Sequence, residues 1–176
     1  GGASLKLTAV STLEVLAYRF PSDNPIFGMC LKSVSKNICS NNSAVSSGCL
    51  RATSAFIHVL GPRALSELPG IMACMFSRSR DISVSVAEES KSHDVSSSTA
   101  SRTMRDSVFL SVLISLEAVV DKLGGFLNPY LGDILELLVL HPWYAFAGDV
   151  KLNLKADVVR KLVTDKIPVS FSIIIF

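Results

Sequence analysis

The sequence has few charged residues and no long uninterrupted apolar segment. Lys, Arg, Asp and Glu together make up 18% of its 176 residues, whereas hydrophobic residues make up 49%. Its most apolar stretch, residues 108–120, is interrupted by Ser111, Ser115 and Glu117. Because a helix needs about 20 consecutive apolar residues to cross a bilayer, the sequence predicts buried helices and no membrane-spanning segment.

Metal-binding patterns are absent as well. No CxxC pair occurs among the four cysteines, and the histidines lie far from them in sequence; the residues concerned are Cys30, Cys39, Cys49 and Cys74, and His58, His93 and His141. Structural zinc sites usually show closely spaced cysteine or histidine pairs. We therefore expect no metal site, and we predict buried free thiols in a reducing compartment.

The motifs of common enzyme classes are also missing. There is no G-x-S-x-G, no P-loop and no G-x-G-x-x-G, and the Gly124-Gly125 pair is typical of a helix terminator rather than a phosphate-binding loop. The net charge of +2 lacks the basic excess of a nucleic-acid-binding protein. The start, GGASLKLTAV, lacks the features of a signal peptide. We expect no catalytic residues, no cofactor, no small-molecule substrate and no membrane association.

What the sequence does contain is a helical unit that returns about every forty residues. Pro69 and Pro129 each come just ahead of an amphipathic run, and Pro168 ends a further run. Pro129 and Pro168 are 39 positions apart, and we attribute the longer spacing of 60 between Pro69 and Pro129 to a polar insert of about twenty residues. A two-helix unit of this period is typical of an α-solenoid, in which each unit buries its apolar face against its neighbours. We predict an all-α fold over residues 1–168, namely an α-solenoid of about four HEAT/armadillo-type helical hairpins, the first and last incomplete.

The apolar spacing and the turn residues place the individual helices. We expect helices over residues 4–20, 26–38, 43–60, 64–76, 102–123, 129–140 and 150–166. Ser43 is the expected N-terminal cap of its helix. Pro69 should mark a helix start or a kink, because it lacks an amide donor.

Two segments do not follow the helical pattern. Residues 77–101 are rich in serine, and we interpret them as a mobile, solvated loop inserted within a repeat. The alternative is a phosphorylated segment that contacts RNA or a partner, with bordering cations at Arg78, Arg80, Arg102 and Arg105. Residues 169–176, VSFSIIIF, are apolar and β-branched, and we interpret them as an atypical tail produced by truncation.

Several single residues invite a functional or a structural interpretation. We expect His58 to be a partly buried packing residue, and His141 to act as a cation at a helix C-terminus. Trp143 and Tyr144 could anchor a partner or fill the gap between successive repeats, and the sequence favours neither.

The charged residues of the last helices receive a structural interpretation. We expect Arg105, Asp106, Asp157 and Arg160 to bridge adjacent repeats or to meet helix dipoles. The mixed charges along residues 149–166 are expected to form an exposed face rather than a binding ridge.

Four strings, in this order, carry a family resemblance: LKLTAVSTLEVLAYRFP (5–21), CLRATSAFIHVLGPRALSELPGIM (49–72), SLEAVVDKLGGFLNPYLGDIL (115–135) and LKADVVRKLVTDKIPV (154–169). They resemble a plant member of the very large HEAT-repeat proteins of the small-subunit processome, which are associated with the U-three small nucleolar RNA. The similar segment comprises the late repeats just before the family's C-terminal domain. The resemblance covers nearly all of residues 4–169 and ends at SFSIIIF, where the family continues with an Arg-containing, Leu- and Pro-rich helix.

The resemblance implies a scaffold of the nucleus and nucleolus that has no catalytic residues. Such a scaffold binds other processome proteins and serves ribosomal RNA processing and ribosome biogenesis, with contact to precursor ribosomal RNA or small nucleolar RNA as a secondary role. One alternative is a generic HEAT or armadillo adaptor in nuclear transport or trafficking. Another is an all-α hydrolase or lipid-handling domain, which would require a deep, ligand-sized pocket with converging polar groups.

Overall fold

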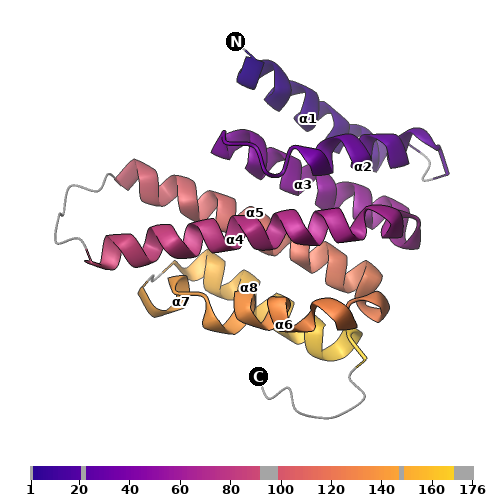
Figure 1. Ribbon diagram of the computed structural model, residues 1–176. Helices are drawn as coiled ribbons and strands as arrows, with labels where there is room; N and C mark the ends of the chain where they lie inside the picture. Colours follow the sequence, from indigo (N-terminus) through magenta and orange to yellow (C-terminus); the bar gives the residue numbers. More distant parts are fainter. Residues whose placement is uncertain (1, 21–22, 92–98, 147–148, 169–176) are drawn as a thin grey trace.

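The computed structural model describes residues 2–20, 23–91, 99–146 and 149–168 (Figure 1). Its α-helices are α1 (Gly2–Arg19), α2 (Ile26–Lys36), α3 (Ser43–Leu60), α4 (Leu68–Lys91), α5 (Thr99–Leu123), α6 (Leu131–Leu135), α7 (Trp143–Phe146) and α8 (Val150–Lys166). Short 3-10 turns cover η1 (Gly61–Glu67), η2 (Gly124–Phe126) and η3 (Asn128–Tyr130), and a π turn covers η4 (Glu136–Leu140). No strand occurs in the described ranges, so the all-α prediction is confirmed.

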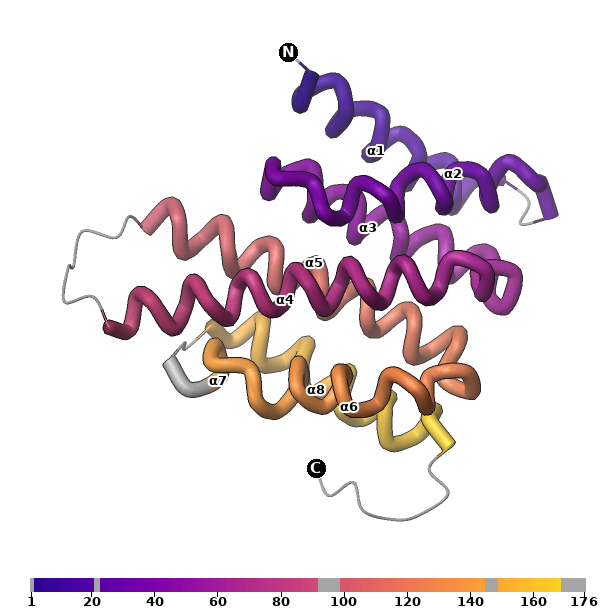
Figure 2. The backbone as a smooth tube through the Cα atoms, in the orientation of Figure 1, coloured from indigo at the N-terminus to yellow at the C-terminus, as the bar shows by residue number. Residues whose placement is uncertain are grey.

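The helices are stacked in two layers (Figures 1 and 2). One layer contains α2, α4 and α6, and the other contains α1, α3, α5 and α8, in order from the N-terminal to the C-terminal end. Within the second layer α3 packs against α1 and α5, and α5 packs against α8. Consecutive helices α2 and α3, and likewise α4 and α5, run in opposite directions and contact each other. The chain thus adds one helix pair after another along the stack.

The position of a helix in the stack decides how much of it is buried. Helices α3 and α5 have neighbours on both sides, and they supply the fully buried rings of Phe56 and Phe109. At the two ends, α1 buries only Val10 and Ala17, and α8 buries one stripe consisting of Leu152, Ala156, Val159 and Val163. Because burial of apolar surface is the main stabilising contribution, the centre of the stack holds most of the core.

Small residues let the central helices approach closely. The hydroxyl oxygens of Ser47 on α3 and Ser111 on α5 are 2.6 Å apart in a buried hydrogen bond. A buried hydroxyl needs a partner to offset its desolvation. The Ser47–Ser111 pair satisfies this requirement across the interface.

Side-chain caps and a glycine mark the helix boundaries. Asn42, and not Ser43 as predicted, caps α3, because its Oδ1 accepts the amide of Val45 at 3.0 Å. Gly61 ends α3 with a φ of 54°, a left-handed conformation that favours glycine. Pro69 is the second residue of α4, so its predicted position at a helix start is confirmed.

The prediction of a loop over residues 77–101 is wrong for most of its length. Helix α4 continues to Lys91, and α5 begins at Thr99, while residues 92–98 lie outside the described part. One serine of α4, Ser79, is buried, and its hydroxyl donates to the carbonyl oxygen of Phe76 at 2.9 Å. Serine has only a weak preference against helix. This weak preference is outweighed by two tertiary contributions: the burial of Ile82, and the ion pair between Glu89 on α4 and Arg105 on α5.

The segment after Pro129 is helical to Leu140, as predicted, but it is not one regular helix. It consists of the 3-10 turn η3, a single α-turn in α6 and the π turn η4. Arg160 on α8 donates to the carbonyl oxygen of Leu138 from Nε at 3.0 Å and from Nη2 at 2.5 Å. This contact supplies the backbone of the π turn with donors from outside the segment. The predicted tail at 169–176 lies outside the described residues.

Candidate interaction surfaces

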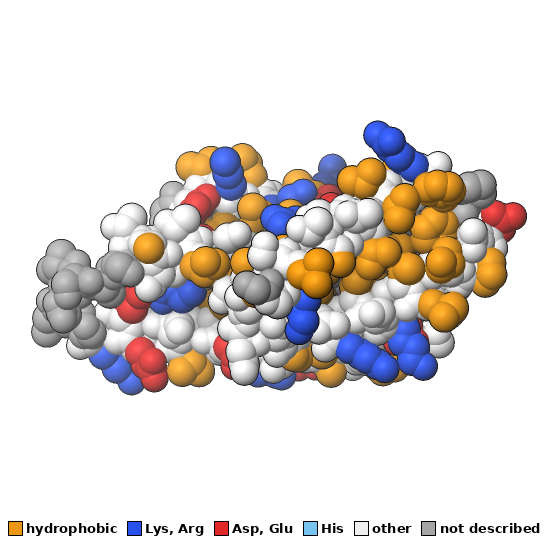
Figure 3. Space-filling model, turned by 90° about the horizontal axis from the view of Figure 1, so that it is seen from above, with side chains coloured by type: hydrophobic (Ala, Val, Ile, Leu, Met, Phe, Trp, Pro, Cys, Tyr) orange, Lys and Arg blue, Asp and Glu red, His pale blue; other side chains and the backbone are white. Residues whose placement is uncertain are grey.

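An apolar surface covers the N-terminal end of the stack. It is formed by outward-facing side chains of α1, of α2 and of the connection between them, each between 50% and 73% exposed: Leu5, Val15, Tyr18, Phe20, Ile26 and Met29. Figure 3 looks down on this end, and hydrophobic side chains gather on its right-hand part. Large exposed apolar patches on soluble domains usually mark contact surfaces. We call these six residues the N-terminal apolar surface.

This surface contains a groove between α1 and α2. Leu13 and Leu16 of α1 line one side, and Ile26 and Cys30 of α2 line the other. The buried rings of Phe27 and Phe56, whose centroids are 5.9 Å apart, also border it. Its volume is about 230 Å³, which is below the range of typical ligand pockets. The groove therefore suits an inserted side chain of another helix better than a complete small molecule.

Apolar side chains are also exposed on the elements at the opposite end of the stack. On η2, η4 and α8, six of them are between 46% and 74% exposed: Phe126, Val139, Leu140, Val150, Leu154 and Val158. Two of them, Leu154 and Val158, are one helical turn apart on α8, on the side away from its buried stripe. We call these six residues the C-terminal apolar surface. The stack thus exposes apolar side chains at both ends.

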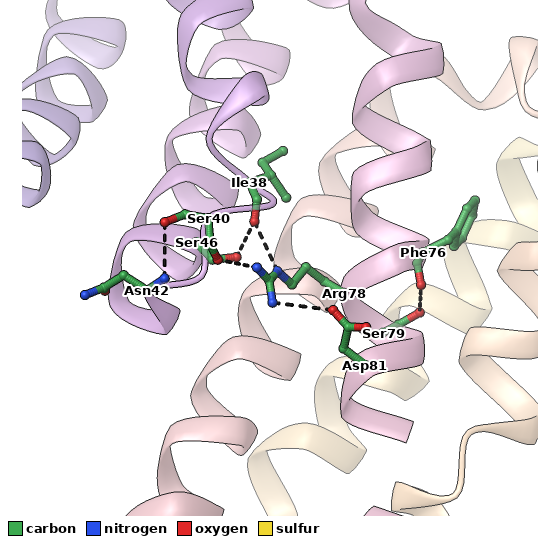
Figure 4. Close-up of polar contacts among 8 residues, drawn as sticks. All are labelled: Ile38, Ser40, Asn42, Ser46, Phe76, Arg78, Ser79 and Asp81. Carbon is green, nitrogen blue, oxygen red and sulfur yellow. Dashed lines mark hydrogen bonds and ion pairs between the residues drawn. The ribbon is translucent and has the colours of Figure 1, made fainter. Parts of the chain in front are cut away.

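The interior of the stack is joined by polar contacts between successive helix pairs. Arg78 on α4 reaches the turn after α2, where its Nε donates to the carbonyl oxygen of Ile38 at 3.3 Å and its Nη2 donates to that of Ser40 (Figure 4). The hydroxyl of Ser46 on α3 donates to the same Ile38 oxygen at 2.5 Å. Arg78 also lies 3.5 Å from Asp81, one turn further along α4. Through these contacts Arg78 joins α4 to the turn between α2 and α3.

Trp143 and Tyr144 lie between helices and do not project from the surface. Trp143 is 2% exposed, and its Nε1 donates to Asp106 on α5 at 3.0 Å. Tyr144 is half-buried beneath the guanidinium of Arg160, 4.8 Å from the ring centroid, and burial raises the pKa of its phenol to about 12. Of the two interpretations that the sequence left open, gap filling is the one that the structure supports. The expected structural roles of Asp106 and Arg160 agree with these contacts.

His141 does not act as a cation at a helix end. It is buried, its Nε2 lies 2.9 Å from the carbonyl oxygen of Ser79, and its ring stacks on Phe109 at 4.4 Å. Burial lowers the pKa of His141, and the hydrogen bond to Ser79 and the charge of Glu136 offset this only in part. The prediction of a charge interacting with the helix dipole is therefore wrong. The surrounding cavity of about 40 Å³ holds little more than a water molecule.

Other predictions for single residues have mixed outcomes. His58 is exposed, because α3 directs it away from both neighbouring helices, so the packing role predicted for it is wrong. Cys49 is buried and Cys30 and Cys74 are half-buried, as free thiols, but Cys39 is exposed. His93 lies outside the described residues.

A larger, open hollow lies where α4 ends and α5 begins. It measures about 710 Å³ and is bordered by Glu88, Glu89 and Arg105. Arg105 is 16% exposed and its Nη2 lies 2.5 Å from Glu89 Oε2, so its charge is already compensated. The ion pair between Arg105 and Glu89 thus occupies one side of the hollow, while Arg105 Nε is buried without a hydrogen-bond partner.

Across the described part of the chain, no three His, Cys, Asp or Glu side chains are grouped closely enough to hold a metal ion. In the same ranges, no helix combines the length and the apolar character that crossing a membrane requires.

One comparison relates the chain to a known protein. It is similar to the uncharacterized protein At3g06530 of Arabidopsis thaliana, with 50% identity over 172 residues. The aligned region covers 98% of this chain but 7% of the Arabidopsis protein. No protein-family model and no solved structure matches the chain. The chain thus spans only a small part of the length of the Arabidopsis protein that it resembles.

Proposed function

We propose that the chain is a segment of a longer α-solenoid of HEAT/armadillo type. In this interpretation α2–α3, α4–α5 and α6–α8 are successive hairpins, and α1 is the second helix of a hairpin that precedes them. The observation that carries the proposal is the pair of exposed apolar surfaces at the two ends of the stack. In a repeat array each unit is covered by its neighbours, and terminal units require polar caps. The chain covers only 7% of the Arabidopsis relative, which is consistent with its being one part of a longer array.

The biochemical role that we propose is a non-catalytic scaffold of the small-subunit processome, in the nucleus and nucleolus. The support is the resemblance of the four strings described above to the large HEAT-repeat proteins of that assembly. The scaffold would act in ribosomal RNA processing by binding processome proteins, with RNA contact as a secondary role.

The architecture can be tested on the purified chain by binding of an environment-sensitive hydrophobic dye and by light scattering. Met29→Asp places a charge in the N-terminal apolar surface at a side chain that is 72% exposed. Val84→Asp is the matched control, because Val84 is 58% exposed but lies on α4, in the middle of the stack. Dye binding and self-association should fall for Met29→Asp and remain near the wild-type level for Val84→Asp. Equal effects of both variants would contradict the assignment of the end surface as a contact surface.

The role is tested by affinity purification of partners from plant nuclear extract, using the whole chain, with and without RNase. Recovery of small-subunit processome proteins under both conditions would support a protein-binding scaffold. Loss of these proteins after RNase treatment would place RNA at the centre of the contact instead. Recovery of transport receptors or of a small GTPase would overturn the processome role and favour a generic HEAT or armadillo adaptor.

A further inference from the structure

Two cysteines from successive helix pairs meet at the contact between the α2–α3 turn and α4. Cys39 is exposed and lies between Ile38 and Ser40, the two residues whose carbonyl oxygens accept from Arg78. Cys74 is half-buried on α4, four residues before Arg78 and therefore on the same side of the helix. Arg78 is hydrogen-bonded to both carbonyl oxygens that flank Cys39. These bonds hold the turn, and Cys39 with it, beside the part of α4 that carries Cys74.

The electrostatic environment of Cys74 agrees with this placement. Burial, together with the neighbouring Cys39 thiol, raises the pKa of the Cys74 thiol to about 11, and the Arg78 charge opposes this rise. A neighbour affects a thiol in this way only at short range. The other two cysteines are separate: Cys30 borders the groove on the N-terminal apolar surface, and Cys49 is buried in α3.

We propose that Cys39 and Cys74 form a reversible disulfide that links one helix pair to the next, with a low-molecular-weight disulfide such as oxidised glutathione as the oxidant. The thiolate of Cys39 attacks one sulfur of glutathione disulfide, forms a mixed disulfide and releases one glutathione thiolate, which takes up a proton. Cys74 then loses its proton and its sulfur attacks the sulfur of Cys39, which releases the second glutathione. Two protein thiols are oxidised, and one glutathione disulfide is reduced to two thiols.

The order of these steps follows from exposure. Cys39 meets the solvent and can be reached by the oxidant, whereas the half-buried Cys74 reacts only within the chain, where the proximity of the mixed disulfide compensates for its raised pKa. In a reducing compartment such a bond is transient and depends on the redox state. It would restrict movement between the α2–α3 pair and α4. The inference does not depend on the proposed processome role.

The test is incubation of the intact protein with glutathione disulfide, followed by mass spectrometry without reduction and by peptide mapping. The wild type should lose two hydrogen atoms, keep no glutathione and yield a linked peptide pair containing Cys39 and Cys74. Cys74→Ser should instead retain one glutathione on Cys39, and Cys30→Ser should behave as the wild type. A stable glutathione adduct on Cys39 of the wild type, or a link to Cys30 or Cys49, would overturn the proposal.

Thermal unfolding of the same samples provides an independent measurement. Because the bond closes a loop of about 35 residues, oxidation should raise the Tm by roughly 5–10 °C. The rise should appear in the wild type and in Cys30→Ser, disappear after reduction, and be absent in Cys74→Ser. No rise in an oxidised wild type whose link has been mapped would show that the bond distorts the contact, and it would contradict the placement of the two thiols.

Discussion

The two adjacent glycines after α5 should respond oppositely to the same substitution. A Cβ atom added at Gly124 would lie 2.7 Å from the carbonyl oxygen of Lys166, 2.8 Å from its Cβ and 3.0 Å from its carbonyl carbon. A Cβ atom at Gly125 would meet nothing within 4 Å. Gly124 is buried and Gly125 is exposed, and neither has a positive φ, so alanine is acceptable to the backbone at both positions.

The magnitude follows from the atoms that must move. At Gly124 the obstacle is mainly backbone at the C-terminus of α8, which cannot rotate away as a side chain would. Overpacking of this kind costs about 1–3 kcal/mol, so the Tm of Gly124→Ala should fall by roughly 3–10 °C. Gly125→Ala meets no obstacle and should be neutral or stabilising by up to about 1 kcal/mol, because alanine restricts the unfolded chain.

The assay is urea unfolding followed by far-ultraviolet circular dichroism, with both variants and the wild type in the same buffer. Amide hydrogen exchange at Ile167, whose N–H donates to the carbonyl oxygen of Val163 at 3.2 Å, reports the end of α8 directly. Exchange there should accelerate in Gly124→Ala and remain unchanged in Gly125→Ala. Equal stabilities and equal exchange rates in the two variants would refute the argument that α8 ends against Gly124.

Further predictions concern the polar contacts of the interior. Trp143→Phe replaces the indole by a smaller aromatic ring and removes the donor to Asp106, leaving that carboxylate without this partner; it should lower the free energy of unfolding by about 1–3 kcal/mol in urea unfolding. Burial lowers the pKa of His141, so the unfolded chain takes up its proton first; this residue's contribution to stability should be complete above about pH 6.5 and decline as the pH falls below it. The loss of stability at low pH should be smaller in His141→Asn than in the wild type. An identical pH dependence of stability in the two proteins would contradict this role of His141. Arg78→Ala should lower the Tm more than Arg80→Ala does. Arg78 is 18% exposed and donates to two carbonyl oxygens, whereas the ion pairs of Arg80 are about half exposed. Thermal unfolding of the two variants measures the difference.

Helix positions could be predicted from the sequence to within a few residues in most cases, because apolar spacing and turn residues are local signals. Residues 150–166 were predicted with the bounds that the structure has, and the helix predicted to end at Leu60 differs from α3 only in its capping residue. The failure over residues 77–91 has a physical cause: serine-rich composition suggested a loop, whereas α4 is held as a helix by its contacts with α5. Intrinsic preferences of a few tenths of a kcal/mol per residue are easily outweighed by such contacts.

Contact surfaces were harder to predict than helices. Trp143 and Tyr144 could have been surface anchors as far as the sequence shows, and only their contacts with Asp106 and Arg160 place them in the interior. Conversely, Met29 and Leu154 have the apolar character of core residues, but they lie at the ends of the stack and are exposed. The meeting of Cys39 and Cys74 has no sequence signal, because it depends on how α4 packs against the turn after α2.

The sequence by itself determined that this protein is all-α and where most of its helices begin and end. These properties depend on local spacing, capping and backbone preference, which act over a few residues. Only the tertiary structure decided which apolar faces are covered, that His141 is buried without charge, and that Gly124 must lack a side chain. Each of these depends on distances between segments far apart in the chain, and such distances exist only once the helices are packed into layers.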